Sequence, residues 1–300
     1  MEIIQSIREM QQFVLNKKQK GNTVGFVPTM GSLHEGHMSL VERAVEENDV
    51  TIMSIFVNPL QFSPGEDFDQ YPRDFEKDER TAGNAGIDVI FYPDTEEMYP
   101  GEPAVTVSVD KRTEVLCGKS RPGHFDGVAT VLTKLFHITI PDRVYFGMKD
   151  AQQIAVVESL IQDFNFPVTL VACPTVREAD GLAKSSRNVY LTEAERKEAA
   201  ALHESLQRGA ELYRGGERDT ECLREEVLAV LNDRLTKAKI EYVEVLTYPS
   251  LKFVERCDGR MIIALAVHFG AARLIDNITL GGEAQTTSFE TSDRLLSEIK

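Results

Sequence analysis

The first half of the chain alternates short apolar runs with helical patterns, and this alternation limits the possible folds more than any single motif does. The run Val50–Val57 is almost wholly apolar, as a strand is when both faces of a parallel sheet are covered. Alternating strands and helices are typical of an α/β fold. We therefore predict an α/β domain with a mostly parallel sheet.

The same patterns give the expected bounds of the elements in this domain. The predicted strands cover Thr23–Val27, Val50–Val57, Asp88–Tyr92, Arg143–Phe146 and Pro167–Ala172. The predicted helices cover Gly36–Glu47, Arg73–Ala85, Gly127–His137 and Ala151–Phe164. Strand and helix alternate along this order, which a parallel sheet requires.

The alternation of predicted strands and helices ends after about residue 180. One long helix is predicted at Thr192–Arg214, with Thr192 as its cap and Glu195 three residues on. A second helix and three strands are predicted at Thr220–Ala238, Glu241–Thr247, Met261–His268 and Ala271–Ile278. Two helices followed by three strands predict a small α+β domain.

The chain is therefore predicted to divide into two domains and a tail. The larger domain covers residues 1–178, and the smaller domain covers 179–280 and closes over the site. The polar residues 281–300 are predicted to be a poorly ordered tail.

Composition and charge exclude several classes of function. The formal net charge is −15, whereas a nucleic-acid-binding protein usually has a basic face. No run of eighteen apolar residues is present, so no membrane span is predicted. Residues 1–21 are amphipathic and lack the basic start and apolar core of a signal peptide. The four cysteines form no CxxC pair, so they are predicted to be reduced thiols in a cytoplasmic protein.

Four unusual polar stretches each follow a predicted strand. Ligands of open parallel sheets bind at the carboxyl ends of the strands, so these stretches should converge on one edge of the sheet. They are Pro28–His37, Asn58–Pro72, Gly147–Gln153 and Thr175–Asn188.

The first of these stretches, PTMGSLHEGH, runs from a strand into a helix. A helix start offers backbone N–H groups and a positive dipole end, and glycines allow a ligand to approach the backbone closely, so this stretch suits a phosphate. A metal site is disfavoured because His34 and His37 are three residues apart with a glycine between them and no third ligand. A capping turn without a ligand remains the alternative.

The other stretches carry groups that suit a polyphosphate ligand. Asn58 and Gln61 bring amides to the end of an apolar strand, and Lys149-Asp150 places a cation and a carboxylate past another strand. The segment Lys184–Arg187 interleaves cations with serine hydroxyls, which bind phosphate by charge and hydrogen bonding. A solvated ion pair or charged loop is the alternative for each of the last two.

Several blocks together resemble the pantothenate synthetase (pantoate–β-alanine ligase) family along nearly the whole chain. The matching blocks are PTMGSLHEGHMSLV, SIFVNPLQF, YPRD, RPGHFDGVATVLTKLF, FGMKDAQQ, PTVREADGLAKSSRNVYLT and ARLIDNI. The family belongs to the nucleotidyltransferases that share a Rossmann-like domain with class I aminoacyl-tRNA synthetases. The resemblance therefore implies a HIGH-type turn at His34–His37 and a KMSKS-like loop at Lys184–Arg187.

The resemblance also implies an activity. The family makes pantothenate from pantoate, β-alanine and ATP through a pantoyl-adenylate intermediate, and it releases AMP and pyrophosphate. It uses Mg²⁺ with ATP and is usually a homodimer. Its partners are these small-molecule substrates, without nucleic acid or membrane. The protein ligands of the magnesium ion are not implied.

Site residues follow from the matching positions. The resemblance implies His37 as proton donor, with His34 and Lys149 also catalytic, and Gln61 and Gln153 as pantoate and β-alanine ligands. Arg121 and Asn58 are weaker candidates. The implied ATP-binding residues are Met30, Gly31, Ser32, Leu33, His34, Glu35, Gly36, His37, Gly147, Met148, Lys149, Asp150, Val176, Lys184, Ser185, Ser186 and Arg187.

Two positions depart from the family pattern, and two other functions remain as alternatives. Glutamate is common where Met148 stands, and methionine or leucine where Lys184 stands; we expect both changes to be tolerated. Another nucleotidyltransferase of this fold would lack the pair Gln61 and Gln153. A non-catalytic nucleotide-binding paralogue would be expected to lose His34, His37 or Lys149.

Overall fold

A six-stranded parallel sheet forms the core of the first half of the chain, in a computed structural model that describes residues 1–63, 65–66 and 68–282. The strand order is β1-β4-β3-β2-β5-β6, and every pairing in this sheet is parallel. This confirms the predicted α/β domain. The strands are β1 (Glu2–Ile4), β2 (Val24–Thr29), β3 (Val50–Ile55), β4 (Val89–Phe91), β5 (Arg143–Gly147) and β6 (Thr169–Cys173).

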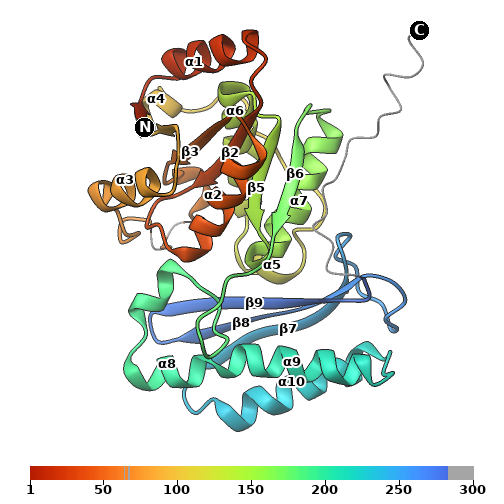
Figure 1. Ribbon diagram of the computed structural model, residues 1–300. Helices are drawn as coiled ribbons and strands as arrows, with labels where there is room; N and C mark the ends of the chain where they lie inside the picture. Colours follow the sequence, from red (N-terminus) through yellow and green to blue (C-terminus); the bar gives the residue numbers. More distant parts are fainter. Residues whose placement is uncertain (64, 67, 283–300) are drawn as a thin grey trace, which may run out of the picture.

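Helices cover both faces of this sheet (Figure 1). On one face pack α1 (Ile7–Gln19), α6 (His124–Thr139) and α7 (Ala151–Asp163), and on the other pack α2 (Glu35–Glu47) and α3 (Phe75–Asn84). Short elements join them: α4 (Thr95–Met98), α5 (Leu116–Ser120) and the 3-10 helices η1 (Pro59–Gln61) and η2 (Met148–Asp150).

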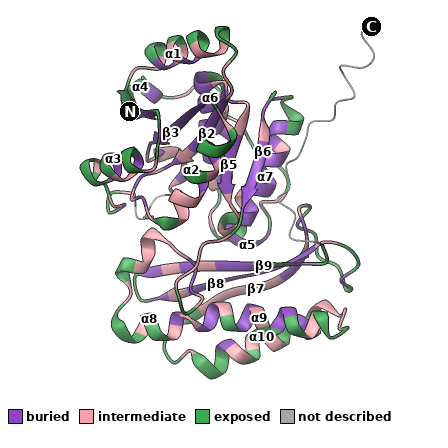
Figure 2. Cartoon of the chain, viewed as in Figure 1, coloured by how far each residue is buried: buried purple, intermediate pink, exposed green. Residues whose placement is uncertain are grey.

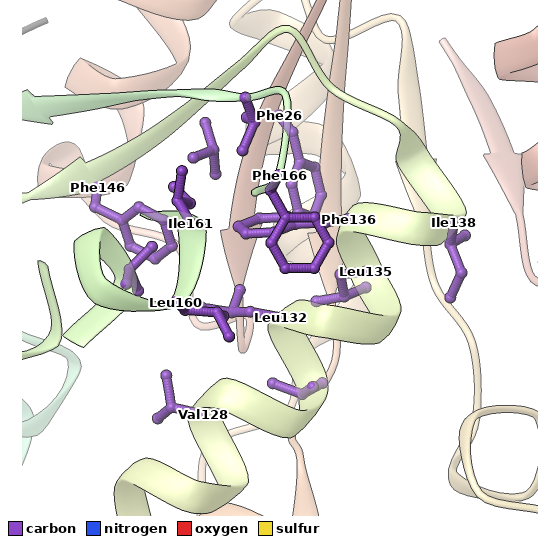
Figure 3. Packing of buried hydrophobic residues seen from close by; sticks show 14 of the residues in the cluster. Phe26, Val128, Leu132, Leu135, Phe136, Ile138, Phe146, Leu160, Ile161 and Phe166 are labelled. Carbon is purple, nitrogen blue, oxygen red and sulfur yellow. The ribbon is translucent and has the colours of Figure 1, made fainter. Parts of the chain in front are cut away.

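The larger apolar core lies between the sheet and α6. Figure 3 shows Phe26 and Phe146 from the sheet facing Leu132 and Phe136 of α6, with Leu160 of α7 beside them. Figure 2 shows β2 and β3, in the middle of this sheet, as almost continuously buried. Burial on both faces explains why β3 is apolar at nearly every position.

A three-stranded antiparallel sheet organises the second part of the chain. Strand β8 (Met261–Phe269) lies between β7 (Lys239–Thr247) and β9 (Ala272–Leu280). Helices α9 (Ala201–Arg214) and α10 (Thr220–Arg234) cover one face of this sheet (Figure 1). The other face packs on α5 and α7 of the first domain. The predicted α+β arrangement is confirmed.

One predicted helix was wrong, and one strand was not predicted. The expected helix Thr192–Arg214 is two helices, α8 (Glu193–Ala199) and α9, which meet at Ala200. The run Ala199–Ala201 has no polar–apolar contrast, so the helical periodicity continues across the break and does not reveal it. Thr192 and Glu195 do form the expected capping box. Residues Glu2–Ile4, which were not assigned to a strand, form β1 beside β4.

Some predictions on domain limits stay predictions. Two buried clusters draw on residues up to Cys173 and a third on residues from Leu182 onward, but the boundary at residue 178 is not fixed by them. The predicted tail falls almost wholly on residues 283–300, which lie outside the described residues. In the described part of the chain, no helix is long and apolar enough to cross a membrane.

Candidate functional site

The order of strands places the site. Strand β2 pairs with β3 on one side and with β5 on the other, so the chain connections diverge on either side of β2. Such a switch point leaves a crevice at the carboxyl ends of the strands, where ligands of open α/β sheets bind. The turn after β2 and the 3-10 helix η2 after β5 both lie at this edge.

A cavity of about 240 Å³ lies at this edge, and all four polar stretches contribute to it. The predicted convergence is therefore confirmed. The predicted site residues that line it are Met30, His34, Gly36, His37, Gln61, Arg121, Gly147, Lys149, Asp150, Gln153, Val176, Lys184, Ser185, Ser186 and Arg187.

Six predicted residues are not in that lining. Gly31, Ser32 and Leu33 approach Asp78 of α3 instead, and Glu35 is exposed and pairs with Lys184. The Met148 sulfur accepts a hydrogen bond from Tyr248. Asn58 is buried and holds structure: its amide donates to Gly127 O and its oxygen accepts from Tyr99.

His34 and His37 cap the helix that carries them. The Gly36 N–H donates to His34 Nδ1 at 3.1 Å, and the His34 N–H donates to His37 Nδ1 at 3.3 Å. His37 N in turn donates to His34 O at 2.8 Å. The sequence predicted free backbone N–H groups at this helix start, but those of Gly36 and His37 already have partners within the protein. A phosphate bound at this edge would need other donors.

These bonds fix the tautomer of both imidazoles. A backbone N–H can only donate, so each Nδ1 carries the lone pair and each neutral ring carries its proton on Nε2. Burial is the main cause that lowers the pKa of His34 to about 4, with a smaller contribution from the Lys149 cation. Burial likewise lowers the pKa of His37 to about 3, with smaller contributions from His34 and Lys149. Both rings are therefore neutral Nε2–H donors at pH 7.

Cations and hydroxyls surround the pair. Lys149 lines the cavity and pairs loosely with Asp150, at 3.5 Å. Lys184 Nζ lies 3.2 Å from Glu35 and 3.0 Å from Glu178, so its charge is already matched by two carboxylates. This pairing supports the expectation that a lysine is tolerated at position 184.

Gln61 is held by two residues of the block RPGHF. His124 Nδ1–H donates to Gln61 O at 2.8 Å, and Arg121 donates to the same oxygen at 3.3 Å. Arg121 also donates to His124 Nε2 and forms a bidentate pair with Glu66. Burial, aided by the Arg121 cation, lowers the pKa of His124 to about 4, so this ring is also neutral. Arg121 thus orients Gln61 as well as lining the cavity.

Part of the cavity lining is apolar. Phe56, Val128, Val131 and Leu132 line it. Ser54 also lines it, on the β3 face toward α6, and its Oγ is buried without a hydrogen-bond partner among the described residues. Sequence reasoning missed Ser54 because a serine inside an apolar strand gives no signal of its own.

Two residues of β9 reach across to the site loops. Asn277 Nδ2 donates to Met148 O and to Lys149 O, each at 2.9 Å. Asp276 is buried and accepts two bonds from Arg177, which begins the loop carrying Lys184. These residues lie in the block ARLIDNI, and that match was the signal that could have found them.

A second cavity of about 540 Å³ adjoins the first, between the two sheets. Lys149, Asp150, Gln153 and Arg187 line both cavities, so together they offer space for a nucleotide beside a small acid. Across the described residues, no group of three or more His, Cys, Asp or Glu side chains is placed to hold a metal ion.

Comparison with known proteins identifies relatives over almost the full chain. The family model of pantoate-β-alanine ligase matches residues 2–279. The pantothenate synthetase of Geobacillus thermodenitrificans is 58% identical over 280 residues, which are 93% of this chain and 96% of the relative. That of Bacillus licheniformis is 58% identical over 275 residues, 92% of this chain and 95% of the relative.

Solved structures agree with these matches. The pantothenate synthetase of Thermus thermophilus superposes with a TM-score of 0.88 at 42% identity, covering 93% of this chain and 99% of its own. The pantoate-β-alanine ligase of Francisella tularensis, complexed with β,γ ATP and β-alanine, gives a TM-score of 0.76 at 35% identity, covering 93% and 97%.

Proposed function

The chain belongs to the pantoate–β-alanine ligase family, and from that premise we propose how its residues share the work of joining pantoate to β-alanine. The enzyme condenses these two substrates to pantothenate and consumes ATP, with AMP and pyrophosphate as the other products. The relative with bound ATP and β-alanine supports both as substrates. The residue roles below are our assignment.

The first step activates a carboxylate. Direct attack by an amine would add charge to a group that is already anionic, so pantoate oxygen first attacks the α-phosphate of ATP and pyrophosphate leaves. The β-alanine amine then attacks the acyl carbon of the pantoyl adenylate, and AMP leaves. The protein contributes positioning and charge stabilisation to both steps.

Two neutral imidazoles carry this proposal. The Nε2–H groups of His34 and His37 donate hydrogen bonds to phosphate oxygens as negative charge builds up on them, and Lys149 adds a positive charge beside them. A proton-donor role for His37 as an imidazolium is disfavoured, because its pKa of about 3 leaves it unprotonated at neutral pH.

Pantoate lies in the part of the cavity between the sheet and α6. Gln61 and Gln153 bind its polar groups, and the apolar residues around Val131 and Leu132 accept its two methyl groups. Ser54 Oγ gains the hydrogen-bond partner that it otherwise lacks when a substrate hydroxyl reaches it. ATP extends toward Val176 and the segment Lys184–Arg187.

Pyrophosphate exchange tests this assignment. Incubated with ATP and Mg²⁺, the protein should exchange labelled pyrophosphate into ATP only when pantoate is present, and should release AMP and an amide when β-alanine is added. Formation of ADP, or exchange that is indifferent to pantoate, would contradict the proposal.

Replacing His37 tests the role of the imidazole pair. His37→Ala should lower the exchange rate by roughly 10²–10³, because one transition-state donor is lost. His137→Ala is the matched control, since His137 is exposed on α6, lies outside both cavities, and its ring hydrogen-bonds to Thr133 O of the same helix. Equal rates in the two variants would refute a catalytic role for His37.

Three further properties are proposed. Mg²⁺, implied by the resemblance, would be held mainly by ATP phosphates and water. From its position, and not from the resemblance, Asp150 would be the carboxylate in contact with it, since Asp150 lines both cavities. Chelation with EDTA should therefore stop the exchange without unfolding the protein. A homodimer and a cytoplasmic location are the other two proposals. Analytical ultracentrifugation tests the first of them.

A further inference from the structure

Asp78 of α3 is a buried carboxylate to which neither the motifs nor the proposed chemistry gives a role. Both its oxygens accept hydrogen bonds from the turn between β2 and α2. Ser32 N donates to Oδ2 and Leu33 N to Oδ1, each at 2.8 Å. Asp78 is only 2% exposed, so this charge is satisfied by two backbone donors that lie more than forty residues away in sequence.

The turn that Asp78 holds has an unusual backbone. Gly31 has a φ of +81° and Ser32 a φ of +53°, both in the left-handed region that non-glycine residues seldom adopt. A Cβ added at Gly31 would lie 2.8 Å from Asp78 Oδ2. Only glycine at position 31 leaves room for the Asp78 carboxylate. The two hydrogen bonds from Ser32 N–H and Leu33 N–H hold the turn in a conformation that is unfavourable for Ser32.

This turn leads directly into the catalytic histidines. Leu33 precedes His34, which is the N-cap of α2 and whose backbone and ring hold the His37 ring in place. A displacement of the Ser32–Leu33 peptides therefore moves His34, and the capping bonds transmit that movement to His37. We propose that Asp78 is a positioning residue that sets the reach of the two imidazoles toward the phosphate.

Asp78 acts through the turn and does not touch the substrate. It lies on the wall of a separate cavity of about 420 Å³ and is absent from the lining of the cavity that contains the histidines. A carboxylate in contact with ATP would repel the phosphates. By binding the N–H groups of Ser32 and Leu33, Asp78 also removes them from the set of phosphate donors that the sequence predicted.

The test replaces the carboxylate by its near-isosteric amide. In Asp78→Asn one backbone N–H faces an amide NH₂ group, so the turn shifts. We expect kcat to fall about 10- to 100-fold, because small misplacements of catalytic groups have effects of this size. The KM for pantoate should change less than about threefold, since Gln61 and Gln153 stay in place. Gly31→Ala displaces the same carboxylate by placing a Cβ against it. It should likewise lower kcat while leaving the KM for pantoate nearly unchanged.

Two comparisons separate positioning from general destabilisation. Asp219→Ala removes a carboxylate that also accepts two backbone N–H bonds, at the start of α10, and should lower the thermal midpoint while kcat is unchanged. In a His37→Ala background, Asp78→Asn should lower kcat by much less than it does alone, because both changes act on the same groups.

The inference rests on the proposed role of the histidines, but the two fail in different ways. Full activity of His37→Ala would refute the role of the imidazole pair. Wild-type kcat in a folded Asp78→Asn protein, or an undiminished effect in the His37→Ala background, would overturn positioning by Asp78. Loss of the folded state in both Asp78→Asn and Gly31→Ala would overturn it too, because Asp78 would then hold the whole domain together.

Discussion

The imidazoles of His34 and His37 cap the helix that carries them. Each Nδ1 accepts a backbone N–H, so the helix start fixes both the ring orientation and the position of the ring proton. The motif predicted which residues belong to the site. It could not predict the tautomer, because that depends on how the backbone N–H groups lie around each ring.

Protonation of the buried histidines should make the folded protein sensitive to acid. The pKa values of His34, His37 and His124 fall from 6.5 to about 4, 3 and 4 in the folded chain. Between pH 6.5 and about 4 the unfolded chain therefore binds more protons, so the free energy of unfolding falls as the pH is lowered through this window. Above pH 6.5 this contribution is constant.

Nuclear magnetic resonance of ring carbons can check this prediction. The signals of these three histidines should stay in their neutral positions from pH 8 to about 5 in the folded protein, and should titrate near 6.5 in urea. Titration near 6.5 in the folded protein would contradict both the burial and the neutral Nε2–H donors.

Helix α6 and the 3-10 helix η1 approach each other so closely that glycine is required between them. A Cβ at Gly127 would lie 2.1 Å from Leu60 O and 2.8 Å from Gln61 N. Asn58 bonds to Gly127 O at the same crossing. The sequence predicted a helix at Gly127–His137, but it predicted neither η1 nor the contact between the two, because a helical glycine in an amphipathic pattern does not show what packs on it.

Replacing this glycine should disturb pantoate binding. Gly127→Ala should push η1 and Gln61 away from α6, lower the free energy of unfolding by about 1–3 kcal/mol and raise the KM for pantoate. Urea unfolding and steady-state kinetics measure the two effects. Gly83→Ala is the control, since its Cβ would meet only Met1 atoms at 3.5 Å or more. An unchanged KM would show that Gln61 does not depend on this contact.

Both domains hold the loops that line the two cavities. Strand β8 packs one face on α9 and α10 and turns the other, with Ile262 and Ala264, toward α5 and α7. From the adjacent β9, Asn277 holds the backbone of Lys149 and Asp276 holds Arg177. The second domain thus fixes the loops of the first. Its closing over the site, which the sequence predicted, stays a prediction.

Removing Asn277 should weaken ATP binding more than pantoate binding. Asn277→Ala frees the carbonyl groups of Met148 and Lys149, so the KM for ATP should rise while the KM for pantoate stays close to that of the wild type. Asn232→Ala, at an exposed position of α10, is the control. Equal rises in both KM values would point to a general loss of structure instead.

The fold class, the family and the set of strand-end stretches that meet at the site could all be predicted from the sequence. Hydrophobic periodicity and motif order are local properties of the chain, so they can be recognised without a structure. Tertiary structure alone decided that Asp78 takes the N–H groups of Ser32 and Leu33, and that Asn277 holds the Lys149 loop. These partners are far apart in sequence, and a hydrogen bond between them exists only once packing has brought the two segments within about 3 Å.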